Sequence, residues 1–236
     1  MRKIVGFIGV LLLVVNGAFA QAVNQFDANG KRHGIWKKNF EGTQVLRYQG
    51  EFNHGKEVGE FKFYKNVNNK AVLTASKQFK ADSDIALTTF YASNGKVVSK
   101  GQAIGKTRIG KWTYFHNNSD KIMTQEHYNS NGNLDGESMI YYENGQTAEH
   151  SHFKDGKLHG QALWYDESGA LIKEYNYIED KLHGKANFYG PKGELKLKGQ
   201  YKNDRRDGIW TYYKNGVVEK EEDYTRRSKN PYKKQE

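Results

Sequence analysis

Histidine is the residue type in this chain that most readily suggests chemistry, because a neutral imidazole can bind a metal ion. His33, His159 and His183 each directly precede a glycine that recurs along the chain. If the recurrence reflects stacked hairpins, equivalent residues lie roughly 9.5 Å apart, too far to share an ion held by bonds of about 2 Å. His150 and His152, two apart on one expected strand, can face the same way. They lack a convincing third ligand in the sequence, so we predict no metal and no cofactor.

Catalytic motifs of other kinds are also missing from the sequence. Carboxylates are scattered through expected turns and polar strand positions. No serine stands in a nucleophile-elbow motif, and no glycine-rich loop precedes a helix. We therefore predict that the protein is not an enzyme, and a glycan-active enzyme is the most distant alternative.

A row of aromatic residues offers a binding chemistry instead, since one ring lies at the same place in every repeat after the first, five residues beyond the position of a recurring glycine. Rings spaced at roughly 9.5 Å can stack on sugar rings or grip an extended peptide, with each phenol hydroxyl at the rim. The competing interpretation is that these rings pack as a second small core. The candidate binding ladder comprises Tyr64, Tyr91, Phe115, Tyr141, Tyr165, Tyr189 and Tyr213.

The recurring glycine, called the anchor below, defines a repeat. Successive anchors are 24 to 26 residues apart, except for one interval of 51 in which Ala86 takes the glycine's place. Self-similarity at such a period indicates an array in which each unit packs against its neighbours. We predict eight repeats of about 25 residues, with structural anchors at Gly34, Gly59, Gly110, Gly136, Gly160, Gly184 and Gly208.

Each unit has the pattern of a β-hairpin. Mostly apolar and aromatic residues at positions +2 and +4 from the anchor alternate with mostly polar residues at +1 and +3, as in a half-exposed strand. A turn such as Asn144-Gly145 or Ser168-Gly169 follows, and then a return strand such as Leu171 to Tyr177. We predict an all-β fold, an elongated single-layer antiparallel β-meander, with the +5 row facing away from the +2 and +4 positions.

The repeat resembles the MORN repeat in its order of aromatic residue, turn glycine or aspartate, anchor glycine, aromatic strand and second turn. Tyr128 to Gly145, Phe153 to Leu171 and Tyr201 to Val217 show this order best. The chain is still more similar to the longer bacterial variant known as the YwqK-type antitoxin family, over about residues 27 to 224. The period of about 25 instead of 23 departs from the family pattern, as does the G-x-W/A start of the strand. The resemblance implies an elongated meander used for binding or scaffolding, and no shared reaction.

The first twenty residues have the plan of a secretory signal peptide. Arg2 and Lys3 precede a twelve-residue apolar run that ends at Val15, and Ala18-Phe19-Ala20 supplies a cleavage motif before Gln21. A membrane anchor would need about 20 apolar residues. We therefore expect a protein that is periplasmic or extracellular after cleavage.

Composition agrees with this organisation. The chain has no cysteine, and its 36% hydrophobic residues are too few for a large globular core, whereas 14% aromatics suit a single layer. We divide the chain into a signal peptide (1–20), a repeat domain (21–225) and a basic disordered tail (226–236).

The charge of the chain is unevenly distributed. Loss of Arg2 and Lys3 would lower the net charge from +10 to +8, and half of that excess lies in the tail. The repeat body is thus only mildly basic, which disfavours a nucleic-acid partner. Weak contact of the tail with an anionic membrane surface is one interpretation, and a solubilising end is the other.

Together these features predict an exported repeat protein that presents an extended surface to a protein or polysaccharide partner at the cell envelope. The alternative is a structural spacer without a dedicated ligand.

Overall fold

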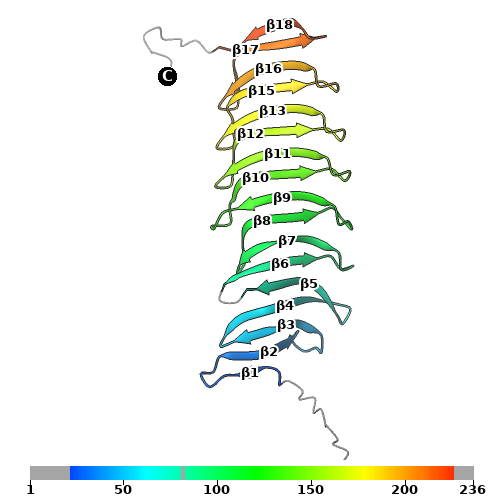
Figure 1. Ribbon diagram of the computed structural model, residues 1–236, viewed down its shortest axis with the longest axis vertical. Coiled ribbons are helices and arrows are strands. Elements are labelled where there is room, and N and C mark those ends of the chain that lie inside the picture. The colour runs from blue at the N-terminus through cyan, green and yellow to red at the C-terminus, as the bar shows by residue number, and fades with distance from the viewer. Residues whose placement is uncertain (1–21, 81–82, 226–236) are drawn as a thin grey trace, which may run out of the picture.

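The computed structural model describes residues 22–80 and 83–225, which form a single row of hairpins (Figure 1). These residues contain no helix, and therefore none that is long and apolar enough to cross a membrane. The expected signal peptide and the basic tail both lie outside the described residues.

Eighteen strands account for most of the described chain. In chain order they are β1 (Gln25–Phe26), β2 (Arg32–Asn39), β3 (Leu46–Asn53), β4 (Lys56–Val67), β5 (Lys70–Phe79), β6 (Ile85–Tyr91), β7 (Val97–Ile104), β8 (Thr107–Phe115), β9 (Ile122–Tyr128), β10 (Leu134–Tyr141), β11 (Thr147–Lys154), β12 (Lys157–Tyr165), β13 (Leu171–Ile178), β14 (Lys181–Leu182), β15 (Gly184–Tyr189), β16 (Leu195–Lys202), β17 (Arg205–Lys214) and β18 (Val217–Asp223).

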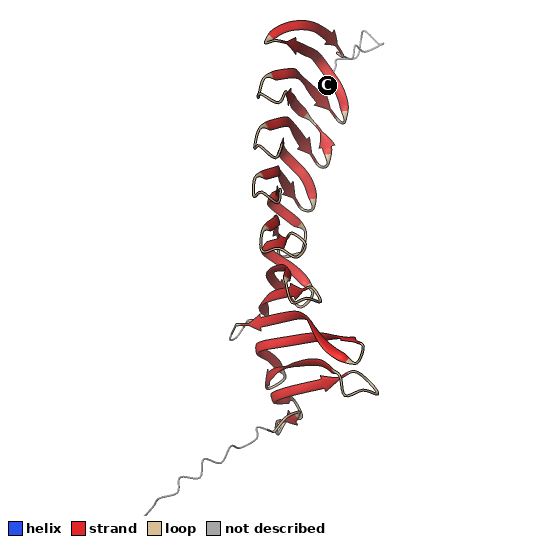
Figure 2. Cartoon of the chain, turned by 90° about the vertical axis from the view of Figure 1, so that its right-hand side faces the viewer, coloured by secondary structure: helices blue, strands red, loops and turns tan. Residues whose placement is uncertain are grey.

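Strands that are neighbours in the chain pair antiparallel, from β1–β2 through β9–β10 to β17–β18. β14 and β15 both pair with β13, so they act as one strand interrupted at His183. The result is an open antiparallel meander, which confirms the predicted fold class. The hairpins are bent, and the row twists along its length (Figure 2). β1 is an additional short strand that the repeat pattern did not predict.

Six of the seven anchor glycines, all except Gly34, lie where their strand carries extra residues relative to the preceding strand. All seven have positive φ, between 61° and 106°, a backbone region that glycine enters without steric cost. Around Gly160, for example, Leu158 pairs with Phe153 and Ala162 with Ser151, so β12 carries two more residues than β11 across this interval. Repeat three has Ala86 at the anchor, and β5 and β6 pair there without any shift. At these six positions the anchor glycine therefore marks a bulge that bends the strand.

A second irregularity falls between positions +4 and +5 in every one of the eight repeats. In the sixth repeat Trp164 pairs with Lys173 but Tyr165 pairs with Leu171, which leaves Ile172 as an extra residue on the return strand. Bulges increase the local right-handed twist of a strand pair. Because the bulge recurs in each hairpin, its twist adds up along the array.

The face of the sheet that carries positions +2 and +4 is called the packed face below. Side chains at +2 form its core. Phe61, Trp112 and Trp210 are at most 1% exposed, and Ala162 and Ala186 are fully buried. Such complete burial in a single layer requires that neighbouring side chains close over these positions.

Large rings at +2 are accommodated by glycine on the preceding strand. A Cβ added to Gly101 would lie within 2.6 Å of three atoms of Trp112, and one added to Gly199 would lie within 2.7 Å of three atoms of Trp210. Gly50 likewise lies under the ring of Phe61. The packed face is therefore tightly filled where a ring and a glycine are paired.

Edge-to-face contacts link these rings along the array. Phe52 and Phe61 have centroids 5.1 Å apart at 87°, and Tyr201 and Trp210 have centroids 5.1 Å apart at 81°. Such T-shaped pairs add to the stabilisation from burial alone. Nearest-neighbour ring contacts therefore take the place of a globular core.

Candidate functional site

The aromatic packing of the packed face is interrupted between repeats three and four. Position +2 of repeat three is Thr88, where repeats two and four have Phe61 and Trp112. Position 103 is alanine, whereas the equivalent residues of the neighbouring repeats are Phe79 and Tyr128. Two large side chains are therefore replaced by small ones at adjacent sites of the sheet.

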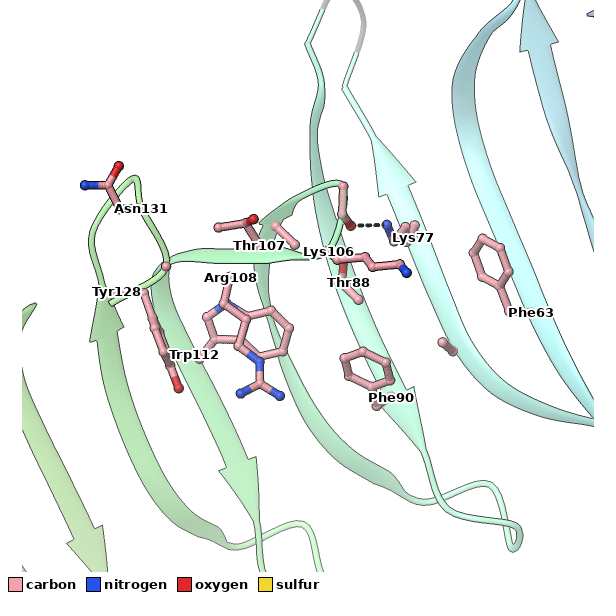
Figure 3. A pocket seen from close by; sticks show the side chains of 14 residues that line it. Phe63, Lys77, Thr88, Phe90, Lys106, Thr107, Arg108, Trp112, Tyr128 and Asn131 are labelled. Carbon is pink, nitrogen blue, oxygen red and sulfur yellow. Dashed lines mark hydrogen bonds between the residues drawn. The ribbon is translucent and has the colours of Figure 1, made fainter. Parts of the chain in front are cut away.

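A groove of about 660 Å³ occupies the interruption, and its volume is within the usual range of small-ligand sites. The labelled side chains in Figure 3 come from β4, β5, β6, β8 and β9 and from the turns that follow β7 and β9. The groove is lined by Phe63, Ala75, Lys77, Thr88, Phe90, Ala103, Gly105, Lys106, Thr107, Arg108, Trp112, Tyr128, Asn131 and Gly132.

The groove is cationic, because Lys77, Lys106 and Arg108 line it and none of its described lining residues is acidic. Lys77 Nζ donates a hydrogen bond of 2.6 Å to the Gly105 carbonyl across the groove (Figure 3). A groove of this kind attracts anionic groups, since low-dielectric walls focus the field of the cations.

Arg108 has a structural role as well as a charge. Its guanidinium carbon lies 4.9 Å from the ring centroid of Trp112 and 6.0 Å from that of Tyr128. Arg32 covers Trp36 at 5.0 Å and Arg206 covers Trp210 at 4.2 Å in the same repeat position. The arginine therefore accompanies each of these +2 tryptophans as a cation–π cover.

Thr88 supplies an unpartnered hydroxyl. Its side chain is 2% exposed, yet Oγ1 makes no hydrogen bond. Leaving a buried hydroxyl unpaired costs free energy that valine, of nearly the same shape, would avoid. A polar atom that costs stability at the floor of a groove is a candidate ligand contact.

The wall on the side of β9 contains a short hydrogen-bond chain. The hydroxyl of Tyr114 lies 3.1 Å from that of Tyr128, which donates to Glu126 Oε2 over 2.6 Å. Burial raises the pKa of Tyr114, as does its bond to Tyr128. Burial and the bond to Glu126 raise the pKa of Tyr128. Both phenols are therefore neutral at physiological pH, and the Glu126 carboxylate already has a partner.

The predicted ladder occupies the opposite face. Tyr91 shares a 3.1 Å hydrogen bond with Ser76, and Tyr141 donates to Gln125 over 3.4 Å, so both hydroxyls reach strand positions that alternate away from the packed face. All seven ladder residues are half-buried. Lys100 and Lys198 lie over the rings of Phe115 and Tyr213. The ladder is thus partly covered by its own neighbours, and the aromatic-cationic groove lies on the other face.

The pairing of β10 with β11 adds a third possible metal ligand to the pair His150 and His152, for which the sequence alone offers no third ligand. Glu137 pairs directly with His152, so its carboxylate lies beside both His150 and His152. The signal for this contact was present, since counting back along the hairpin from the pair Gly136 and Phe153 places Glu137 opposite His152. The remaining histidines do not form a group of three or more metal-ligating side chains within the described residues.

Comparison with known proteins identifies the repeat. Residues 134–155, 158–179, 182–203 and 206–225 each match the family described as MORN repeat variant. The first of these segments covers the hairpin β10–β11 and the last covers β17–β18, so the unit of the family is one hairpin of the structure. No curated protein matches the chain.

A β-meander of such repeats is typically a non-catalytic scaffold or binding surface. Four consecutive hairpins of the chain thus match MORN repeat variants, and they continue the hairpin array that forms the preceding repeats.

Proposed function

We propose that this protein is an exported binding scaffold whose groove in repeats three and four holds a carboxylate-bearing polysaccharide of the cell envelope. The observation that carries the proposal is the groove itself, with aromatic walls, three cations, no acidic lining residue and a buried unpartnered hydroxyl. Aromatic walls suit the apolar face of a sugar ring, and the cations suit its carboxylate.

Hydroxyl and amide groups at the groove add to the argument for a sugar. Thr88, Thr107, Tyr128 and Asn131 all line it, so neutral hydrogen-bonding groups surround the rings. A few convergent polar groups on a largely apolar surface are typical of small-molecule and cofactor sites. An acidic protein segment is the competing partner, because carboxylates on a peptide would meet the same cations.

The proposals that the protein is exported and that it belongs to a particular subfamily rest on the sequence. The basic, apolar and small-residue order of residues 1–20 supports secretion with cleavage before Gln21, and a periplasmic or extracellular site is where envelope polysaccharide is met. The resemblance to the YwqK-type group supports placing the chain in that group of the MORN repeat variants. The structural-spacer alternative predicts no ligand for the groove.

The test measures binding of two probes, an oligogalacturonate and a glutamate-rich peptide containing tyrosine, by isothermal titration calorimetry. Wild type is compared with Thr88→Val and Lys106→Ala. We expect oligogalacturonate binding that each variant weakens by roughly tenfold, about the loss of one charge-assisted or buried hydrogen bond.

Matched controls lie outside the groove. Ser138→Ala changes a buried hydroxyl at the same +2 position of repeat five, and Lys157→Ala removes an exposed lysine at the start of β12, so both should bind as wild type does. If the peptide binds and the oligogalacturonate does not, the groove binds a protein partner instead of a polysaccharide. Binding of neither probe would favour the spacer.

A further inference from the structure

We infer that Glu137, His150 and His152 form a binding site for a borderline divalent transition metal such as Zn²⁺, on the face opposite the groove. Glu137 belongs to β10, and the two histidines belong to β11. Ser138 and Ser151 between and beside them are buried on the packed face, so the three ligands alternate to the other side.

The distances fit coordination better than they fit a salt bridge. His150 Nε2 lies 3.5 Å and His152 Nε2 lies 3.7 Å from Glu137 Oε1. Charge-assisted hydrogen bonds are about 2.7 to 2.9 Å long, so neither nitrogen donates to the carboxylate. Tetrahedral Zn²⁺ with bonds of about 2.1 Å separates its ligand atoms by roughly 3.4 Å. The three ligand atoms all lie within 4.8 Å of one another, so modest side-chain rotations would complete this geometry.

One imidazole is already oriented as a metal ligand. His152 Nδ1 lies 3.1 Å from the Gln161 carbonyl, which can only accept a hydrogen bond. Nδ1 therefore carries the proton, and the lone pair of the neutral ring is on Nε2, the atom that faces Glu137. Metal-bound histidines are commonly oriented by such a second hydrogen bond.

The other imidazole has a nitrogen without a partner. His150 Nε2 is buried and makes no hydrogen bond, although its ring lies 4.9 Å from that of His152. Buried polar atoms are normally paired, so an unpaired one needs an explanation. An ion held between the three side chains would satisfy it.

The cluster is a departure from the repeat. The three equivalent places hold Lys111, Gln125 and His127 in the preceding hairpin pair, and Gln161, Glu174 and Asn176 in the following one. The hairpin therefore folds without this combination of ligands, and periodicity does not account for it.

Ligand chemistry selects the class of ion. Two imidazoles and one carboxylate suit Zn²⁺, Ni²⁺ or Cu²⁺, whereas Ca²⁺ and Mg²⁺ prefer oxygen ligands alone. The side chains of Glu137 and His152 are 57% and 39% exposed, which leaves the fourth position open to water or to a donor from a partner.

The test titrates the purified full chain with ZnCl₂ at pH 7.5 by calorimetry and records the visible spectrum with CoCl₂. We expect one saturable site that Glu137→Gln and His152→Gln each weaken by at least about tenfold. Tetrahedral Co²⁺ absorption should be lost in the same variants. Both residues are half-exposed, and circular dichroism checks that the variants stay folded.

Two control variants address the other histidines. His127→Gln removes the residue equivalent to His152, and His33→Gln disrupts the second histidine pair, with His54, whose rings lie 4.8 Å apart. Both should retain wild-type affinity. The inference is overturned if wild type shows no saturable Zn²⁺ binding, or if Glu137→Gln and His152→Gln bind as tightly as it does.

Discussion

Replacement of Gly101 by alanine tests the interlocking of ring and glycine that holds the packed face together. The added Cβ would lie 2.4 Å from Trp112 Cδ2, 2.5 Å from Cγ and 2.6 Å from Cε2. Ordinary contacts between carbon atoms are about 3.5 to 4.0 Å, so the ring must move by roughly 1 Å. Trp112 is 1% exposed, and its movement would press on Phe90 and Tyr114, whose ring centroids lie 6.1 and 6.4 Å away.

Overpacking of this kind costs about 1 to 3 kcal/mol of stability. Alanine also reduces the conformational entropy of the unfolded chain, which stabilises the folded protein by less than about 1 kcal/mol. We expect a net destabilisation of about 2 kcal/mol, which corresponds to a melting temperature lower by roughly 4 to 8 °C. The assay is thermal unfolding followed by circular dichroism, with urea unfolding as a second measure.

Gly190→Ala is the matched control. Gly190 also has ordinary backbone geometry, but its added Cβ would meet the ends of the Glu194 and Lys196 side chains, which can move into solvent. A double-mutant cycle with Trp112→Ala then isolates the ring contact, because Gly101→Ala should cost little once the ring is gone. An unchanged melting temperature for Gly101→Ala, or an equal cost in the Trp112→Ala background, would refute the interlocking argument.

Three further predictions concern other parts of the array. Gly160→Val should destabilise the protein by at least about 1 to 2 kcal/mol in urea unfolding, because φ at this bulge is +95°. Replacing Tyr141, Tyr165 and Tyr189 together by serine should lower the melting temperature by several degrees, since the rings are half-buried, while retention on isolated envelope material tests the ladder. Hydrogen bonds from Lys220, Tyr224 and Tyr212 lower the pKa of Glu222 to about 2, so Glu222→Gln should destabilise the last hairpin most above about pH 5 and progressively less as the pH falls to 2.

Each of these predictions has a contrary outcome. If Gly160→Val is as stable as wild type, positive φ at the anchor does not require glycine. Lost retention of the tyrosine variant at unchanged melting temperature would favour the ladder over the groove as the binding surface. A chemical shift titration that places the Glu222 midpoint near 4.3, the ordinary value for glutamate, would remove the proposed pH dependence.

The repeat and its secondary structure were readable from the sequence because they depend on local chemistry. Alternation of polar and apolar residues along 157–165 specifies a strand, and Asn144-Gly145 specifies a turn, whatever the rest of the chain does. The anchors Gly34, Gly59, Gly110, Gly136, Gly160, Gly184 and Gly208 are recognisable for the same reason, since a positive φ favours glycine at each repeat.

Side-chain partners across strands depend on register, which the alternation of polar and apolar residues alone does not supply. The β10–β11 hairpin, with its bulge between Ile140 and Tyr141, sets the pairing that brings Glu137 to His152, and without that register the third ligand is missed. The groove likewise arises because Thr88 and Ala103, 15 residues apart in sequence, lie on neighbouring strands of the packed face.

The sequence by itself therefore determined an all-β array of hairpin repeats, because turn geometry and two-residue periodicity are properties of short segments. Only the tertiary structure decided which small residues adjoin which rings, and hence where the packed face is filled and where it is open. Trp112 fills the space above Gly101, whereas the groove lies where Thr88 and Ala103 replace larger side chains. Packing depends on the summed volumes of residues that are distant in the chain, and this sum cannot be read from any single position in the sequence.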